Sequence, residues 1–210
     1  MSNFFHINIL FQSFLISLII TEKLDTNKVN EVLLAQHNKY RKMHDVPELV
    51  LDNELIKLAQ DYSAALAYKK ENEFSKYSVS PSGAKNKEKE NIGENIFTCT
   101  SVLKTNCYDI TSTKPVDEWY NEIKNYNFSE PGFTIDSSHF SQLIWKETTK
   151  IGCGASVADD EVTFKVVCNY YKAGNVLNKE KFEENVLPFS FDKKIMLNNF
   201  SILLLLLNLF

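Results

Sequence analysis

Apolar side chains recur every three or four residues in several parts of the chain, which is the spacing of one face of a helix. The first part predicts a helix from about Thr26 to Met43, ended by Val46-Pro47. Asp52 is placed as the N-cap of a second helix, which runs to about Lys70. Leu51 and Ile56 have the spacing of a hydrophobic staple around that cap.

The second half of the chain shows two further helical patterns and then a change of period. Pro115 suits the first turn of a third helix that carries Trp119, and a short helix is expected over His139–Trp145. Lys150–Val157 and Val162–Tyr170 alternate between polar and apolar residues, as the strands of a hairpin do. Helices followed by an antiparallel sheet predict an α+β layered domain.

The most apolar segments lie at the two ends of the chain. The uncharged run from Ile7 to Ile20 has the length of a signal-peptide core and is too short for a comfortable membrane span. Residues 1–21 are therefore expected to be a signal peptide, although no Lys or Arg precedes the run, and an uncleaved anchor is the alternative. The folded domain is expected over residues 26–188.

Residues 189–210 are expected to form a C-terminal extension with a hydrophobic tail. Its last ten residues, Ser201–Phe210, are too few to span a bilayer as a helix. Two interpretations stay open: the tail of a GPI signal, or an extension that packs on the domain or on a membrane surface.

Composition narrows the function classes. A chain of 210 residues suits one domain, and its net charge of −4 argues against a nucleic-acid partner. Arg41 is the single arginine among 23 Lys and Arg residues, which argues against a phosphate site built on arginine clamps.

Four cysteines behind a signal peptide indicate two disulfides, which agrees with an oxidising compartment. A short hairpin turn over residues 158–161 would place Cys153 opposite Cys168, within bridging distance. Cys99 and Cys107 would then pair across a short loop; four reduced thiols are the alternative. Two sequons, at Asn127 and Asn199, are candidate glycosylation sites in a secreted protein.

Four segments carry the chemically informative residues: Gly93-Glu-Asn-Ile96, Trp119-Tyr-Asn-Glu122, His139–Trp145 and Cys168–Asn175. They offer two carboxylates, Glu94 and Glu122, and the imidazole of His139. Glu122 follows Trp119 by three residues, so the two share a helix face. Spacing alone does not show whether the three ionisable groups meet.

In this order, the four segments resemble the signature of the CAP superfamily of cysteine-rich secretory, antigen-five and pathogenesis-related proteins. The stretch from Glu118 to Phe133 and the later FEENVLP look most like Golgi-associated and fungal secreted members. The resemblance covers about Val29–Pro188. It implies a three-layer α-β-α sandwich with a central antiparallel sheet, and it supports the Cys153–Cys168 pairing.

Family members often present two His and two Glu in a cleft that can hold zinc. By motif, Glu94, Glu122 and His139 match three of these positions, but the chain has no histidine between His44 and His139. One His and two Glu would hold zinc or another divalent cation only weakly, so no cofactor is expected. A hydrogen-bonded polar cleft, with His139 donating to one Glu, is the preferred interpretation.

The resemblance further implies a secreted, non-enzymatic protein that binds sterols, fatty-acid-like lipids or a receptor protein. Four aromatic residues are candidates for lipid contact: Trp119, Tyr126, Phe128 and Phe133. The alternative is a weak metal-assisted hydrolase that uses Glu94, Glu122 and His139. No G-x-S-x-G or H-E-x-x-H motif supports that alternative.

Overall fold

A computed structural model describes residues 24–68, 90–100, 112–158 and 162–190. The predicted signal peptide, the hydrophobic tail, Cys107, Asn199 and the hairpin turn over 159–161 lie outside these residues. Within them, no helix combines the length and the apolar character needed to cross a membrane.

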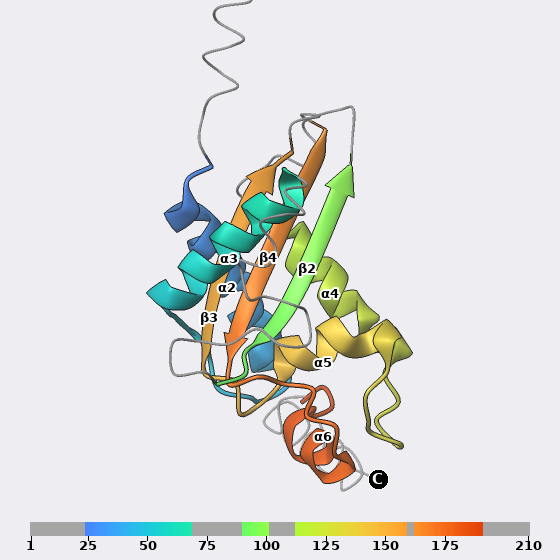
Figure 1. The fold of residues 1–210 in the computed structure, drawn as a ribbon. Helices are drawn as coiled ribbons and strands as arrows, with labels where there is room; N and C mark the ends of the chain where they lie inside the picture. The colour runs from blue at the N-terminus through green and yellow to red at the C-terminus, as the bar shows by residue number, and fades with distance from the viewer. Residues whose placement is uncertain (1–23, 69–89, 101–111, 159–161, 191–210) are drawn as a thin grey trace, which may run out of the picture.

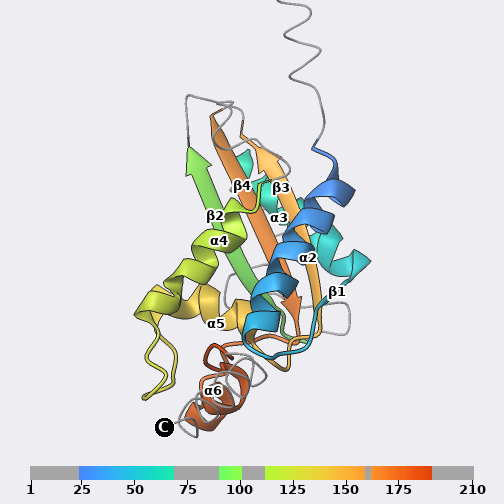
Figure 2. The ribbon, with the colours of Figure 1, turned by 180° about the vertical axis from the view of Figure 1, so that it is seen from behind.

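The described chain forms an α-β-α sandwich, which confirms the predicted fold class (Figure 1). Helix α3 covers one face of the sheet, and α2, α4 and α5 cover the other (Figure 2). Helix α6 lies beyond one end of the sheet. The helices are α2 (Thr26–Met43), α3 (Asn53–Ala67), α4 (Lys114–Asn121), α5 (Ser138–Ile144) and α6 (Lys179–Asn185).

The sheet has four strands in the order β1-β3-β4-β2. Strands β3 and β4 form the predicted antiparallel hairpin, and β2 also pairs antiparallel with β4. The family resemblance implied an antiparallel sheet, but the two-residue β1 pairs parallel with β3 and makes the sheet mixed. The predicted hairpin register is confirmed, because Cys153 pairs with Cys168. The strands are β1 (Val50–Leu51), β2 (Gly93–Thr100), β3 (Lys150–Val157) and β4 (Thr163–Tyr171).

Local capping explains where the first two helices begin. Asp25 Oδ1 accepts from the backbone N–H groups of Asn27 and Lys28, and α2 then ends at Met43 as predicted. Asp52 accepts from Glu54 and Leu55, so its predicted role as N-cap of α3 is confirmed. Helix α3 ends at Ala67, slightly before the predicted end at about Lys70. Helix α4 gives way at Glu122 to a 3₁₀ turn over Glu122–Asn125.

Strand alternation sorts the core into two layers. Ile151, Cys153 and Ala155 of β3 belong to the larger cluster, which includes Trp119 and residues of α2. On the other face, Gly152 and Gly154 leave room for α3 to approach closely. A Cβ on Gly154 would lie 2.2 Å from the backbone nitrogen of Gln60 in α3, so only glycine allows this contact.

The side chain of Arg41, from helix α2, is fully buried. Its guanidinium donates to the backbone carbonyls of Pro47, Leu143, Trp145 and Thr148 at 2.7–3.0 Å. Desolvation lowers the pKa of Arg41 to about 10. The single arginine therefore anchors α2 to the end of α5 through backbone acceptors.

Candidate functional site

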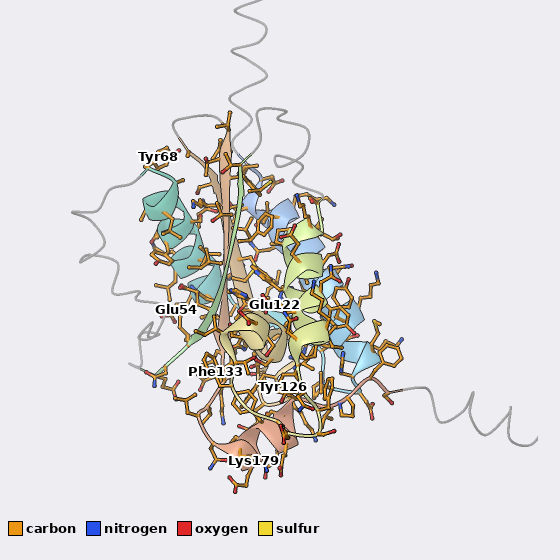
Figure 3. All side chains as sticks on the ribbon, turned by 90° about the vertical axis from the view of Figure 1, so that its right-hand side faces the viewer. Glu54, Tyr68, Glu122, Tyr126, Phe133 and Lys179 are labelled. Atoms are coloured by element: carbon orange, nitrogen blue, oxygen red, sulfur yellow. A yellow bond between two sulfur atoms is a disulfide. The ribbon has the colours of Figure 1, made fainter. Side chains whose placement is uncertain are left out.

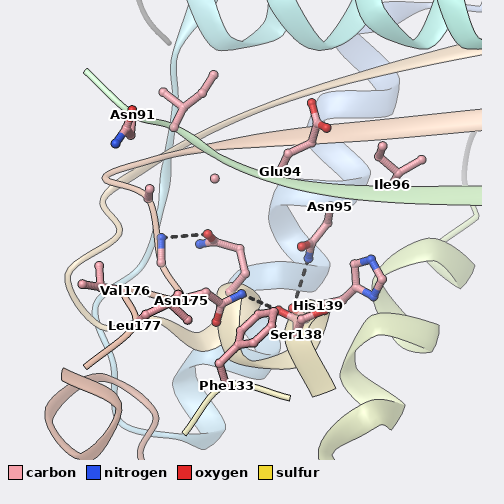
Figure 4. Close-up of a pocket in the computed structure, with 15 residues that line it drawn as sticks. Asn91, Glu94, Asn95, Ile96, Phe133, Ser138, His139, Asn175, Val176 and Leu177 are labelled. Carbon is pink, nitrogen blue, oxygen red and sulfur yellow. Dashed lines mark hydrogen bonds between the residues drawn. The ribbon is translucent and has the colours of Figure 1, made fainter. Parts of the chain in front are cut away.

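A cavity of about 720 Å³ lies between the start of β2, helix α5 and the segment after β4 (Figure 4). Residues 91–96 and 173–177 form two of its sides. A volume of this size is typical of small-ligand pockets, which range over roughly 300–1,000 Å³. The cavity is therefore the candidate binding site.

Gln142 of α5 holds the floor of the cavity together. Its Oε1 accepts from the backbone N–H of Gly174 at 2.8 Å, and its Nε2 donates to Thr148 at 3.3 Å. A Cβ on Gly93 would lie 1.9 Å from the same Oε1. Asn175, whose φ of 56° is in the left-handed region, donates to the carbonyl of Ser138 at 2.9 Å (Figure 4). These polar side chains are occupied in building the floor.

Apolar side chains at the edge of the cavity face solvent instead. Phe133, Val176 and Leu177 line it and are 46%, 48% and 81% exposed. Ile135, two residues beyond Phe133, is 79% exposed. Three apolar side chains gathered around one cavity mark a surface that another apolar molecule can cover. We call Phe133, Val176 and Leu177 the apolar rim.

Glu122 and His139 form a close pair at the start of α5. His139 Nδ1 donates to Glu122 Oε1 at 2.7 Å. Glu122 Oε2 accepts from the backbone N–H groups of His139 at 3.0 Å and Phe140 at 3.3 Å. The His139 ring also stacks on Trp119, with 6.2 Å between ring centroids and 22° between planes. Glu122 thus caps the first turn of α5 while it orients the imidazole.

Glu94 does not join this pair. Ile96, two residues farther along β2, packs against the α3 cluster, so strand alternation places Glu94 on that same face. Asn95, between them, points the other way and donates to the carbonyl of His139 at 3.1 Å. Figure 4 shows the Glu94 carboxylate and His139 on opposite sides of β2. Glu94 and His139 both line the cavity, but among the described residues Glu94 Oε2 bonds Asn169 while His139 bonds Glu122.

The surroundings of Glu94 are poor in donors. With the Asn169 amide oriented to suit its neighbours, its nitrogen donates to Glu94 Oε2 at 3.2 Å, and its oxygen accepts from the backbone N–H of Ala59. Glu94 Oε1 is buried and has no hydrogen-bond partner. Burial accordingly raises the pKa of Glu94 from its ordinary 4.5 to about 7.

A buried chain of hydrogen bonds links α2 to the start of α5. His37 Nδ1 lies 2.7 Å from the carbonyl of Leu33, and its Nε2 lies 2.8 Å from the hydroxyl of Tyr170. Asn95 donates both to that hydroxyl, at 3.2 Å, and to the carbonyl of His139. Burial lowers the pKa of His37 to about 4. The backbone of His139 is thus fixed from the core as well as by Glu122.

The residues that the structure describes do not suit a metal ion. Among them, no group of three His, Cys, Asp or Glu side chains is placed to hold one. Glu122 and His139 are committed to each other, and Glu94 lies across β2 from both.

The four candidate lipid-contact aromatics divide into two kinds. Trp119 and Tyr126 are buried, and Phe128 packs edge-on against Tyr126 and Phe140. These three belong to or pack on the main core cluster. Phe133 alone of the four lines the cavity. Figure 3 shows Phe133 and Tyr126 on the α6 side of Glu122.

The other site predictions have mixed outcomes. Cys153 and Cys168 form the predicted disulfide. Cys99 is disulfide-bonded as well, and its expected partner, Cys107, lies outside the described residues. Asn127 is exposed, as a glycan acceptor must be, but its glycosylation stays a prediction.

Sequence reasoning missed Val176 and Leu177. They follow the Gly174-Asn175 turn as two adjacent apolar residues in a loop that carries neither helical nor strand periodicity. Because such a pair does not fit a helix or strand face, the sequence does not place it in the core. This was the available sign that the pair could form an exposed apolar surface. Gln142 carried no such sign, because its role depends on two glycines distant in sequence.

Comparison with known proteins agrees with this fold. The cysteine-rich secretory protein family model matches residues 34–170. The chain is 45% identical over 159 residues to Golgi-associated plant pathogenesis-related protein 1 of Homo sapiens, covering 76% of this chain and 92% of that protein. It is 32% identical to Repressed by EFG1 protein 1 of Candida albicans, covering 75% of this chain and 53% of that protein.

A solved structure supports the same assignment at the level of the fold. Schistosoma mansoni venom allergen-like protein 4 superposes with a TM-score of 0.56 at 20% identity, over 79% of this chain and 97% of that one. Sandwich, disulfide, motif order and family match all agree. The chain belongs to the cysteine-rich secretory protein, or CAP, family.

Proposed function

We propose that this protein is a secreted, non-enzymatic binding module that takes an apolar ligand, such as a sterol or a fatty chain, into the cavity beside β2. The observation that carries the proposal is the apolar rim at a cavity of about 720 Å³. The family resemblance of the four sequence segments implies the same class of ligand.

The rim is large enough to matter energetically. Fully burying one large apolar side chain contributes about 1.5–3 kcal/mol. Covering the exposed parts of Phe133, Val176 and Leu177 therefore contributes on the order of 3–5 kcal/mol before the costs of association. Burial of the ligand's own apolar surface adds to this, so micromolar affinity, about 8 kcal/mol, is within reach.

The hydrolase alternative receives no support from the site. It needs Glu94, Glu122 and His139 around one reacting group, and β2 separates Glu94 from the other two. The Glu122 carboxylate is occupied by three donors, so it is placed to orient His139 and cap α5. A binding role needs only the cavity and its apolar rim, and no contact between Glu94 and the Glu122–His139 pair.

The test is saturable binding of radiolabelled cholesterol and palmitate to the full chain. The variant Val176→Ser/Leu177→Ser removes two members of the apolar rim and is expected to weaken binding at least tenfold, which corresponds to about 1.4 kcal/mol. The matched control is Val50→Ser/Leu51→Ser, which changes two exposed apolar residues on β1. Unchanged affinity in the rim variant, or no saturable binding of either lipid, overturns the proposal.

Secretion has a separate test. The Cys153–Cys168 disulfide supports an oxidising compartment. Intact-mass spectrometry of protein recovered from culture medium is expected to report loss of residues 1–21 and two disulfides. Retention of the protein inside the cell with reduced thiols would contradict this part of the proposal.

A further inference from the structure

The polar groups of the cavity are mostly committed to one another. The amides of Gln142, Asn95 and Asn175 donate to, or accept from, neighbouring protein groups. The imidazole of His139 differs, because its side chain is 35% exposed and only its Nδ1 has a hydrogen-bond partner among the described residues. Its Nε2 is therefore a polar atom available to a ligand.

The hydrogen bond between His139 and Glu122 determines whether Nε2 donates or accepts a hydrogen bond. A carboxylate accepts hydrogen bonds, so the proton of the neutral ring lies on Nδ1, toward Glu122. Nε2 then carries a lone pair and accepts. The orientation is well fixed, since Glu122 is held by two backbone N–H groups and the ring stacks on Trp119.

The charges around the cavity also favour a ligand group that donates a hydrogen bond and carries no negative charge. None of the described residues that line it is Lys or Arg, and Glu94, the acidic residue among them, has its carboxylate across β2 from His139. Glu122 lies directly behind the His139 ring. A ligand carboxylate would meet acceptors and negative charge with no cation to offset them. A hydroxyl can donate to Nε2 without bringing a charge into the cavity.

We infer that the cavity selects amphiphiles by their head group: His139 Nε2 accepts a hydrogen bond from a ligand hydroxyl while the apolar rim covers the hydrocarbon body. The inference rests on the proposed function and narrows its ligand class to alcohols, sterols included, over carboxylates with the same chain. In this arrangement Glu122 is a positioning residue that acts through His139.

The test compares three ligands with one chain length on the full-length protein: 1-dodecanol, dodecanoate and dodecyl methyl ether. Titration calorimetry at pH 8 measures each affinity. Dodecanol is expected to bind about threefold to tenfold more tightly than the ether, the range of one net hydrogen bond. Dodecanoate is expected to bind more weakly than dodecanol by at least tenfold.

Two variants assign the preference to one atom. His139→Phe keeps an aromatic ring over Trp119 but removes Nε2, so the alcohol-to-ether ratio is expected to fall to about one while the ether affinity stays the same. His139→Gln supplies a carbonyl acceptor and is expected to restore part of the preference. Circular dichroism checks the fold of both. If His139→Phe does not fold, the ligand affinity ratios of the wild type and of His139→Gln still test the inference.

The possible failures are distinguishable. If all three ligands bind wild type equally, or dodecanoate binds best, the head-group inference is overturned and the proposed apolar site stands. An alcohol preference that survives in His139→Phe likewise removes His139 from its role. If none of the ligands binds, both the inference and the proposed function fail.

Discussion

Replacement of Glu94 by glutamine is expected to change how stability depends on pH. Glu94 is packed under α3 with one oxygen bonded to Asn169 and the other without a partner. Burial raises its pKa from 4.5 to about 7, so the folded state holds this proton more tightly than the unfolded state. The wild type therefore loses stability as the pH rises from about 4.5 through 7, and the loss is complete above that.

The magnitude follows from the shift. A change from 4.5 to about 7 corresponds to roughly 3 kcal/mol at 1.36 kcal/mol per pKa unit. The side chain keeps some contact with solvent, which screens the penalty, so we expect about 1–2 kcal/mol. Glu94→Gln removes the ionisation but leaves an amide in the same place. Any change in folding free energy caused by the amide itself is the same at every pH, so it cancels when the stabilities at two pH values are compared.

Urea unfolding at pH 5 and pH 8 measures this difference. From pH 5 to pH 8, Glu94→Gln is expected to gain about 1–2 kcal/mol relative to wild type. Glu48→Gln, at an exposed carboxyl on the loop before β1, is expected to follow wild type. His37, with its pKa near 4, costs stability as the pH falls below 6.5, but it does so equally in all three proteins. Parallel profiles for wild type and Glu94→Gln would refute the burial argument.

Three further changes test the packing that positions the site, each by thermal or urea unfolding. Arg41→Met leaves several buried carbonyls without their donor and is expected to cost about 3–5 kcal/mol; a loss under 1 kcal/mol would contradict its anchoring role. Cys153→Ala/Cys168→Ala opens a bridge over a sequence separation of 15 and is expected to cost about 3 kcal/mol, so unchanged stability would show the disulfide to be dispensable. Gly154→Ala is expected to destabilise the fold by at least ~2 kcal/mol because its Cβ would meet the α3 backbone. Gly132→Ala, with open space around it, is the control and is expected to be nearly neutral. Equal effects of the two substitutions would argue against the close contact.

The parts of the fold that depend on local sequence were predictable. Asp52 caps α3 through contacts two and three residues away, and alternation within the hairpin set the Cys153–Cys168 register. In both cases the deciding interactions lie within a short stretch of chain or across one turn. The family motifs extended this reading to the whole sandwich.

The candidate site was only half predictable, because it depends on which face of a strand each side chain takes. Glu122 and His139 meet, as the preferred polar-cleft interpretation requires, but the motif that groups Glu94 with them does not show that Glu94 lies on the strand β2. Once Asn95 is known to point at α5, alternation sends Glu94 to the other side. Matching a motif to a family position identifies the residue and leaves its orientation open.

Burial of the aromatic residues was likewise not decided by their density in sequence. Trp119 packs against His37 of α2 and His139 of α5, and Tyr126 packs against Phe140 of α5, so both contacts exist only after the helices pack. Phe133 lines the cavity and stays 46% exposed. The apolar rim is completed by Val176 and Leu177, more than 40 residues later in the chain.

Methyl-resolved NMR of the full chain during titration with 1-dodecanol tests the binding site most directly. The account predicts saturable shifts of the Val176 and Leu177 methyl resonances, while those of Val50 and Leu51, on the β1 edge, stay unchanged. Saturable shifts confined to Val50 and Leu51, or no shift at Val176 and Leu177 up to the solubility of the ligand, would contradict it.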